Sequence, residues 1–333
     1  MIRLALALLI FTSSFAFSVQ AQERLLIGAM RQIANGALFL ADAKGYFKAE
    51  GLEVELIAYA SEADVAEAVA ANGVDLGLAA FTPAAFNFVG RGYMKAIAAQ
   101  AREKREYEGT VLVASPVAYA HGLRSFEALA NRAVAIDKVG TLYHYQLGQI
   151  IRVKRFERNS IVMKPLQSMD AIARAVGTQQ VDAALLPPQY ARELLTASQA
   201  RFVGWYSELD EHQLGAVFAS SKAIEGKRPA IEKFVRAYKR GIADYALLLR
   251  LDRGKRMSSE NSRKVATLIA RYVFPGKPLG TSAATVEMGA YYIEPQGKLD
   301  PVEVARQVEW YKAQGLIDDT VDMQNVVDSS FFK

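Results

Sequence analysis

The sequence contains no cysteine and three histidines among its 333 residues. Without cysteine the chain can form no disulfide, thiol nucleophile, cysteine metal site or lipid-modified cysteine. The histidines, His121, His144 and His212, are too widely separated for a metal-ligand motif. The motifs of serine hydrolases, zinc peptidases and phosphate-binding loops are also missing. We therefore expect no enzymatic activity, no bound metal and no cofactor.

The chain also lacks a strong charge of either sign. Its formal net charge is +5, acidic and basic residues are interspersed, and no basic stripe alternates with aromatic residues. We therefore expect no nucleic-acid partner. Beyond the N-terminus no stretch supplies the roughly 20 apolar residues of a membrane-spanning helix. A composition that is 51% hydrophobic and 23% charged is typical of globular proteins, and 333 residues suffice for two domains.

The N-terminus has the features of a secretory signal peptide. Arg3 provides a positive charge, Leu4 to Phe17 is a short apolar segment, and small residues occur at Val19 and Ala21. We predict that residues 1–21 are the signal peptide, that it is cleaved after Ala21, and that the mature chain is exported to a bacterial periplasm. An uncleaved anchor is the alternative, although the apolar segment is short for one.

One phrase occurs twice in the sequence. Residues 73–83 read GVDLGLAAFTP and residues 180–190 read QVDAALLPPQY, so each has Val-Asp before a short apolar run and a proline after it. A serine that can cap a helix precedes each copy, and aliphatic residues of one helical face follow at identical offsets. This pattern indicates two related α/β halves. The matched positions are Ser61 and Ser168, Val65 and Ile172, Val69 and Val176, and Asp75 and Asp182.

Apolar strands and amphipathic helices alternate along the chain. Residues 24–30 and 52–59 are predicted strands joined by a helix that ends at Gly45, and such β-α-β units build parallel sheets. The chain beyond Pro229 is predicted to be helical. Further strands are expected at residues 110–115, 132–141, 201–206 and 215–220. The predicted fold class is α/β.

Several segments carry a resemblance to a known family. The most specific is AKGYFKAEGLEVE at residues 43–55. Shorter segments are ANGVDLGLAA (71–80), GRGYMKAIAA (90–99), SFEALANRAVAI (125–136), TQQVDAALLPP (178–188) and GLIDDTVDMQNVVDSSF (315–331). With these segments the chain resembles periplasmic solute-binding proteins of ABC importers, of the group that handles nitrate, taurine and other sulfonates, and thiamine-pyrimidine precursors.

The resemblance implies a two-lobed periplasmic binding protein fold of type II, in which two doubly wound α/β domains are joined by two crossover strands. Lobe 1 would comprise residues 22–112 and 215–333, and lobe 2 would comprise residues 113–214. The segments TVLVA (110–114) and GAVFAS (215–220) would be the crossovers. Each lobe would hold one copy of the repeated phrase, and each copy would end at the cleft between the lobes.

Open α/β sheets bind ligands beyond the carboxyl ends of their strands. This rule selects the loops at residues 30–35, 80–83, 139–144 and 187–190. The strongest single candidate is the helix start at Thr141, because free backbone N–H groups there would suit a carboxylate, a sulfonate, nitrate or a polar ring edge.

Polar and aromatic residues in these loops are the candidate ligand contacts. The guanidinium of Arg31 could pair with an anion or simply reach solvent, and His144 could donate to a ligand, titrate near neutrality or be structural. Thr141 and Asn35 could contact the ligand or only cap a helix. Aromatic residues at the strand ends could form walls for a planar ligand or belong to the core. The candidate ligand-binding residues are Arg31, Gln32, Asn35, Phe81, Thr82, Thr141, Tyr143, His144, Gln189, Tyr190 and Trp205.

Together these observations predict a monomeric protein that captures a small organic solute by hinge closure and delivers it to an inner-membrane permease. The solute would be an anion, a planar aromatic or heterocyclic compound, or a sulfonate. A periplasmic ligand-sensing module for a receptor is the alternative use of the same two lobes. A thiamine-pyrimidine biosynthetic enzyme of this fold is disfavoured, since the resemblance ties that activity to a cysteine-rich motif and the chain has no cysteine.

Overall fold

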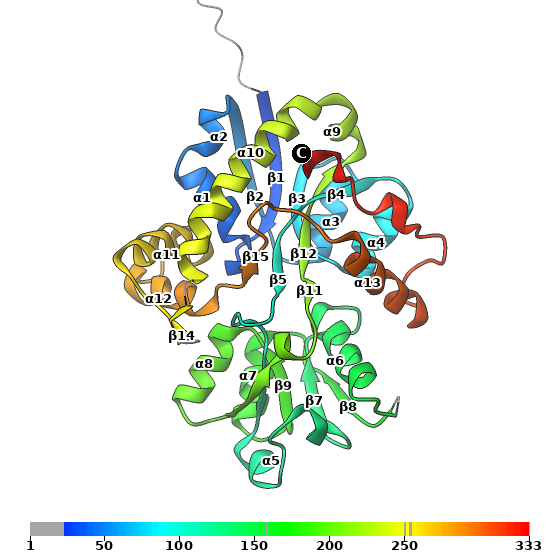
Figure 1. Ribbon diagram of the computed structural model, residues 1–333, viewed down its shortest axis with the longest axis vertical. Helices are drawn as coiled ribbons and strands as arrows, with labels where there is room; N and C mark the ends of the chain where they lie inside the picture. Colours follow the sequence, from blue (N-terminus) through cyan, green and yellow to red (C-terminus); the bar gives the residue numbers. More distant parts are fainter. Residues whose placement is uncertain (1–22, 158, 250, 253–254, 333) are drawn as a thin grey trace, which may run out of the picture.

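The computed structural model describes residues 23–157, 159–249, 251–252 and 255–332. The predicted signal peptide and its cleavage site lie outside these residues. Two five-stranded sheets, one above the other in Figure 1, are joined by a narrow three-stranded sheet. We call the first sheet with its helices lobe 1 and the second sheet with its helices lobe 2. No helix within the described ranges is long and apolar enough to cross a membrane.

The sheet of lobe 1 has the strand order β2-β1-β3-β12-β4. Strand β1 pairs in parallel with β2 and β3, whereas β12 pairs antiparallel with β3 and β4. Strands β3 and β12 are almost entirely apolar because helices bury both faces of the sheet. The strands are β1 (Glu23–Met30), β2 (Leu52–Tyr59), β3 (Leu76–Ala80), β4 (Met94–Ala99) and β12 (Gly215–Ser220).

The sheet of lobe 2 has the order β8-β7-β9-β6-β10, which repeats the topology of the first. Strand β7 pairs in parallel with β8 and β9, and β6 pairs antiparallel with β9 and β10. The repetition confirms the two related α/β halves predicted from the repeated phrase. The strands are β6 (Val111–Ala114), β7 (Ala133–Ile136), β8 (Val162–Pro165), β9 (Ala183–Leu186) and β10 (Arg201–Trp205).

Two short strands cross between the lobes. Strand β5 (Ala101–Glu103) leads from β4 to β6, and β11 (His212–Gln213) leads from β10 to β12. They pair antiparallel, and β15 (Tyr292–Ile293) pairs with β5. The prediction that 110–114 and 215–220 are the crossovers is therefore wrong, because residues 111–114 and 215–220 form β6 and β12 within the two large sheets. An apolar run shows that a strand is buried, but not which sheet it joins. The boundaries between the lobes stay a prediction.

The repeated Val-Asp pair lies just before β3 and β9. The Asp75 carboxylate accepts a hydrogen bond from the backbone N–H of Leu26 at 2.9 Å, and the Asp182 carboxylate accepts one from that of Ala133 at 2.8 Å. In both cases the partners are 49 residues apart in sequence. Each aspartate N–H also donates to the carbonyl of the same partner. The repeated aspartates thus fasten the central strand of each sheet to its parallel neighbour.

Hydrophobic clusters cover both faces of each large sheet. In lobe 1, helices α1, α10 and α11 pack on one face and α3, α4 and α13 on the other; in lobe 2, α5 and α6 lie opposite α7 and α8.

Ser61 and Ser168 cap α3 and α7, as predicted. Gly45 has a φ of 69° at the end of α1, which glycine adopts readily. The helices are α1 (Gly36–Ala43), α2 (Tyr46–Ala49), α3 (Glu62–Ala70), α4 (Pro83–Gly90), α5 (Pro116–Ala120), α6 (Leu142–Val153), α7 (Met169–Gly177), α8 (Pro188–Thr196), α9 (Ser221–Gly226), α10 (Arg228–Tyr245), α11 (Glu260–Val273), α12 (Leu279–Gly289) and α13 (Pro301–Ala313).

Candidate functional site

The loops selected from the sequence meet where the two lobes touch. A Cβ placed on Gly140 of lobe 2 would lie 3.2 Å from Cγ of Pro83 in lobe 1. The hydroxyl of Tyr311 lies 3.3 Å from the carbonyl oxygens of both Phe81 and Thr141, so its proton can bond to either lobe. We call the region formed by residues 30–35, 80–83, 139–144 and 187–190 the inter-lobe junction.

A small apolar cluster forms the side of the junction next to the crossing strands. Ala101, Leu214 and Tyr291 are buried there, and Ala34 and Leu142 pack against them. Ala34 comes from the loop after β1, and Leu142 is the first residue of α6. The cluster therefore brings the first predicted loop of lobe 1 together with the predicted helix start of lobe 2.

Lobe 1 presents polar groups at the end of β1. Arg31 is exposed and has no ion pair within the residues that the structure describes. The side chain of Gln32 donates to Glu62 at 2.7 Å, and the other oxygen of Glu62 accepts from the N–H of Ala80 at 2.8 Å. Burial raises the pKa of Glu62, while these hydrogen bonds oppose the shift. Glu62 thus ties together the ends of two parallel strands.

Asn35 is buried and its side chain binds other parts of lobe 1. Its amide nitrogen donates to the carbonyl of Met30 at 2.9 Å, and its oxygen accepts from the side chain of Gln100 at 2.5 Å. Both contacts hold the loop after β1 in place, and the side chain makes no capping hydrogen bond to α1. Ligand contact by Asn35 stays a prediction.

Phe81 and Thr82 follow β3. Phe81 is 1% exposed and stacks on Phe86, with ring centroids 5.3 Å apart, so its ring belongs to the core of lobe 1. Thr82 caps α4 by accepting a hydrogen bond from the N–H of Ala85 at 3.3 Å. In this region the ring of Pro83, rather than either of these two side chains, lies next to Gly140 of the other lobe.

The helix start predicted after Thr141 is present. The hydroxyl of Thr141 donates toward Asp137 at 2.5 Å and the carbonyl of Lys138 at 2.8 Å, and it makes no capping hydrogen bond to α6. The backbone N–H groups of the first turn are therefore left without a side-chain cap, and the positive end of the helix dipole lies at the junction.

His144 and Tyr143 lie in that first turn, where His144 faces α13 of lobe 1 and Tyr143 packs in a hydrophobic cluster of lobe 2. Nδ1 of His144 accepts a hydrogen bond from the N–H of Gly140 at 3.1 Å, and its ring lies edge-on to Trp310. Burial lowers the pKa of His144. Tyr143 is 9% exposed, and burial together with nearby Tyr291 raises its pKa.

The structure does not bring the four predicted aromatic residues into one wall. Phe81 packs in lobe 1 and Tyr143 in one cluster of lobe 2, while Tyr190 and Trp205 pack against the opposite face of that sheet. Trp205 lies edge-on to Phe202, with ring centroids 5.4 Å apart. Burial, and to a lesser degree the carboxylate of Asp170, raise the pKa of Tyr190.

Gln189 is a candidate of lobe 2 that meets residues of lobe 1. A Cβ on Gly289 would lie 2.8 Å from Oε1 of Gln189 and 2.5 Å from Cδ1 of Ile33, so the three residues converge. Oε1 is buried and has no hydrogen-bond partner within the described residues. A cavity of about 190 Å³ opens beside these residues, between α8 and α12. It is lined by Arg192, Leu248, Arg256, Met257, Ser258, Ala284, Glu287 and Met288.

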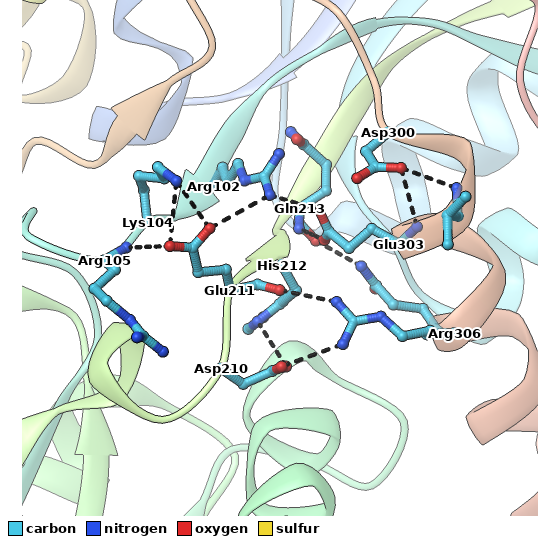
Figure 2. A network of polar contacts seen from close by, with 12 residues as sticks. Arg102, Lys104, Arg105, Asp210, Glu211, His212, Gln213, Asp300, Glu303 and Arg306 are labelled. Atoms are coloured by element: carbon cyan, nitrogen blue, oxygen red, sulfur yellow. Dashed lines mark hydrogen bonds and ion pairs between the residues drawn. The ribbon is translucent and has the colours of Figure 1, made fainter.

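A polar network holds the second crossing strand to the C-terminal helix α13 (Figure 2). The carboxylate of Glu303 accepts a hydrogen bond from the backbone N–H of Gln213 and lies 3.3 Å from Nη2 of Arg102. Arg306 donates to the Asp210 carboxylate at 3.3 Å and to the carbonyl of Glu211 at 3.0 Å. Burial raises the pKa of Glu303 to about 8, against the influence of Arg102.

A second acid is buried beside this network. Glu103 ends β5 and is fully buried, and its Oε1 accepts from the N–H of Thr110 at 2.9 Å and from Nε2 of Gln146 at 3.2 Å. Burial raises the pKa of Glu103 to about 7. No group of three or more metal-ligating side chains in the described part of the chain could hold a metal ion.

Sequence reasoning missed the residues that later helices bring to the junction. Gly289, Tyr291 and Tyr311 come from the helical C-terminal region, to which the rule of strand ends does not apply. Glu62 lies on α3, which follows the predicted strand at residues 52–59, and Arg192 lies on α8, which begins in a predicted loop. Their charges are ordinary features of a helix surface, so only the folded structure distinguishes them.

Comparisons with known proteins agree with this architecture. A family model described as NMT1/THI5 like matches residues 33–247, whereas no curated protein matches the sequence. The periplasmic aliphatic sulphonate binding protein SsuA from Escherichia coli is similar in structure, with a TM-score of 0.72 and 15% identity over 93% of this chain and 99% of that one.

Two further structures show the same likeness. A putative periplasmic sulfonate-binding protein SsuA from Methylobacillus flagellatus KT has a TM-score of 0.69 and 13% identity over 94% of this chain and 93% of that one. The periplasmic nitrate-binding protein NrtA from Synechocystis PCC 6803 has a TM-score of 0.68 and 11% identity over 93% of this chain and 87% of that one. The predicted two-lobed, type II fold of periplasmic binding proteins is confirmed.

Proposed function

The chain belongs to the NMT1/THI5-like family, and on this premise we propose that it is the solute-binding component of an ABC importer. The observation that carries the proposal is the inter-lobe junction, where strand ends of two separate sheets contact each other. A solute held there would touch both lobes, so binding would favour their closed arrangement. The fold neighbours that bind sulphonates and nitrate agree with this role.

We infer that the solute is a small organic anion. The uncapped first turn of α6 offers N–H groups and a positive dipole end, which suit a carboxylate or sulfonate. Arg31 is exposed at the end of β1, and Arg192 lines the cavity beside Gln189. A planar neutral ring is less well supported, because the aromatic candidates lie in separate clusters.

The remaining parts of the proposal follow from this role. We propose that the protein is exported to the periplasm, acts as a monomer without a cofactor, and delivers its solute to a membrane permease. We propose that its role is binding without catalysis, as its similarity to solute-binding proteins suggests. A receptor partner instead of a permease would leave the binding chemistry unchanged, and complex formation with each candidate partner distinguishes the two.

A thermal-shift screen tests solute binding. The panel holds aliphatic sulfonates, nitrate, small carboxylates, heterocyclic acids and neutral pyrimidines. A solute at a hundredfold excess over its Kd raises the free energy of unfolding by about 2.7 kcal/mol. We expect shifts with organic anions only. Shifts with neutral pyrimidines alone would refute the anionic class, and a panel without any hit would refute the proposed function.

Arg31 and closure are tested with the solute that the screen identifies. Arg31→Ala should weaken binding of an anion, whereas Arg201→Ala, an exposed arginine on β10, should not. Equal affinities for both variants would remove Arg31 from the site. Small-angle scattering at saturation should show a smaller radius of gyration, and unchanged compactness would count against capture by hinge closure.

A further inference from the structure

The lobes are joined by an ionic contact beside the inter-lobe junction. Glu108 lies in the connection between β5 and β6, and its Oε2 contacts two guanidinium groups. Nη2 of Arg192, on α8 of lobe 2, lies 2.5 Å away. Nε of Arg256, on the short strand β14 (Lys255–Arg256), lies 3.0 Å away. One carboxylate oxygen therefore links α8 to a strand next to α12, on the left of Figure 1.

The lobe 1 end of this contact is firmly anchored. The Arg256 side chain is 10% exposed, and it donates to the carbonyl oxygens of Glu287 at 2.6 Å and Ala290 at 2.8 Å. These carbonyls lie at the C-terminal end of α12, where a helix favours a positive charge. Helix α12 packs on α11, and α11 packs on α1 of lobe 1. Arg256 therefore keeps Glu108 with lobe 1.

The lobe 2 end can be released at little cost. The Arg192 side chain is 33% exposed, and Glu108 is its one hydrogen-bond partner among the residues that the structure describes. When the lobes separate, the guanidinium of Arg192 can return to water, which solvates it well. The Arg192–Glu108 contact is thus the part of the ionic group that opening would break.

We propose that the Arg192–Glu108 ion pair is a latch that holds the two lobes closed and so sets the affinity and residence time of the bound solute. This inference rests on the proposed function, because a latch has an effect only if the lobes open and close. The same helix supports both roles: α8 carries Gln189, which meets Gly289 at the junction, and Arg192 follows one turn later. Closing over a solute and forming the ion pair are therefore one movement of α8 against α12.

The partial burial of the pair sets the expected size of its effect. Glu108 is 12% exposed and Arg192 is 33% exposed, so the pair lies between an exposed ion pair and a buried one. We expect loss of the pair to speed solute dissociation about fivefold, a value between those two cases. Because added salt screens the attraction, the closed fraction of the wild type should also fall as salt is raised.

Distances between the lobes in the absence of solute test the latch directly. The chain has no cysteine, so spin labels at Lys277→Cys, before α12, and Thr196→Cys, at the end of α8, report one inter-lobe distance by pulsed electron resonance. We expect Arg192→Gln to move the distribution to longer distances and Arg192→Lys to restore part of the short one. Arg201→Gln, an exposed arginine of the same lobe, is the matched control and should change nothing.

The outcomes separate this inference from the proposed function. A wild type without the short distance, or an Arg192→Gln distribution identical to that of Arg201→Gln, would overturn the latch. A solute screen without a hit would overturn the proposed function. The distances measured without solute would even then show whether Arg192 holds the lobes together. Thermal unfolding of each labelled variant verifies that the distances are measured on folded protein.

Discussion

Removal of either repeated aspartate should destabilise the protein by the same mechanism in both lobes. In Asp75→Ala, the backbone N–H of Leu26 in β1 loses its acceptor, and Nζ of Lys227 loses an ion-pair partner that lies 2.8 Å away. In Asp182→Ala, the N–H of Ala133 loses its acceptor at the edge of β7. The two variants therefore perturb corresponding positions of two sheets with the same topology.

The structure sets the order of the two effects. A buried donor left without a partner costs about 1–3 kcal/mol. The Asp75 side chain is 15% exposed and that of Asp182 is 34% exposed, so water can replace the second acceptor more easily. We expect losses of about 2 kcal/mol for Asp75→Ala and about 1 kcal/mol for Asp182→Ala. The asparagine variants keep an acceptor oxygen and should lose less.

Urea unfolding followed by circular dichroism measures these losses. Glu67→Ala is the control, because Glu67 is an exposed residue on α3 whose side chain has no hydrogen bond or ion pair to the residues that the structure describes. The reasoning is refuted if the alanine variants lose no more than Glu67→Ala does. It is also refuted if asparagine is no better than alanine, since the retained oxygen would then have no value as an acceptor.

Two further predictions concern the region between the lobes. Because Glu103 binds a proton more tightly when folded, with a pKa of about 7 instead of 4.5, stability should fall as pH rises from about 4.5 to 7, by up to about 1.4 kcal/mol per pH unit; Glu103→Gln should flatten this slope in urea titrations across that range. A Cβ on Gly148 would lie 2.3 Å from the rigid ring of Trp310, so Gly148→Ala should cost about 1–3 kcal/mol in thermal unfolding. Gly226→Ala, where a Cβ meets nothing within 4 Å, should cost far less, and equal losses would contradict the packing argument.

Local patterns in the sequence were sufficient to predict the two halves of the fold. The serines at residues 61 and 168 cap helices, and the aspartates at residues 75 and 182 bind the neighbouring strand, because these are interactions over short or repeated spacings. Glycine at residue 45 ends a helix for the same local reason. The serine caps and Gly45 are decided by local chemistry, whereas each aspartate contact spans 49 residues and is marked in the sequence only by the repetition of its pattern.

Pairing between distant segments could not be predicted in this way. The crossing strands contain the short sequences ARE and HQ, which are too short and polar to show a strand period, whereas the apolar β6 and β12 next to them are conspicuous. Whether an aromatic residue at a strand end turns toward the core or toward the junction depends on which helix covers it. Phe81 turns to the core because Phe86 and Phe218 lie there.

The duplicated units supply the strand ends of the junction, but they do not close it. Tyr311, Gly289 and Arg256 come from the chain after residue 247, where the match to the family model ends. Helix α13 also binds the second crossing strand through Glu303 and Arg306, so it lies against the segment about which the lobes would turn (Figure 2). The unduplicated C-terminal helices therefore act on both the crossing strands and the edges of the junction. A change in the residues with which these helices meet the crossing strands and the junction should therefore alter closure.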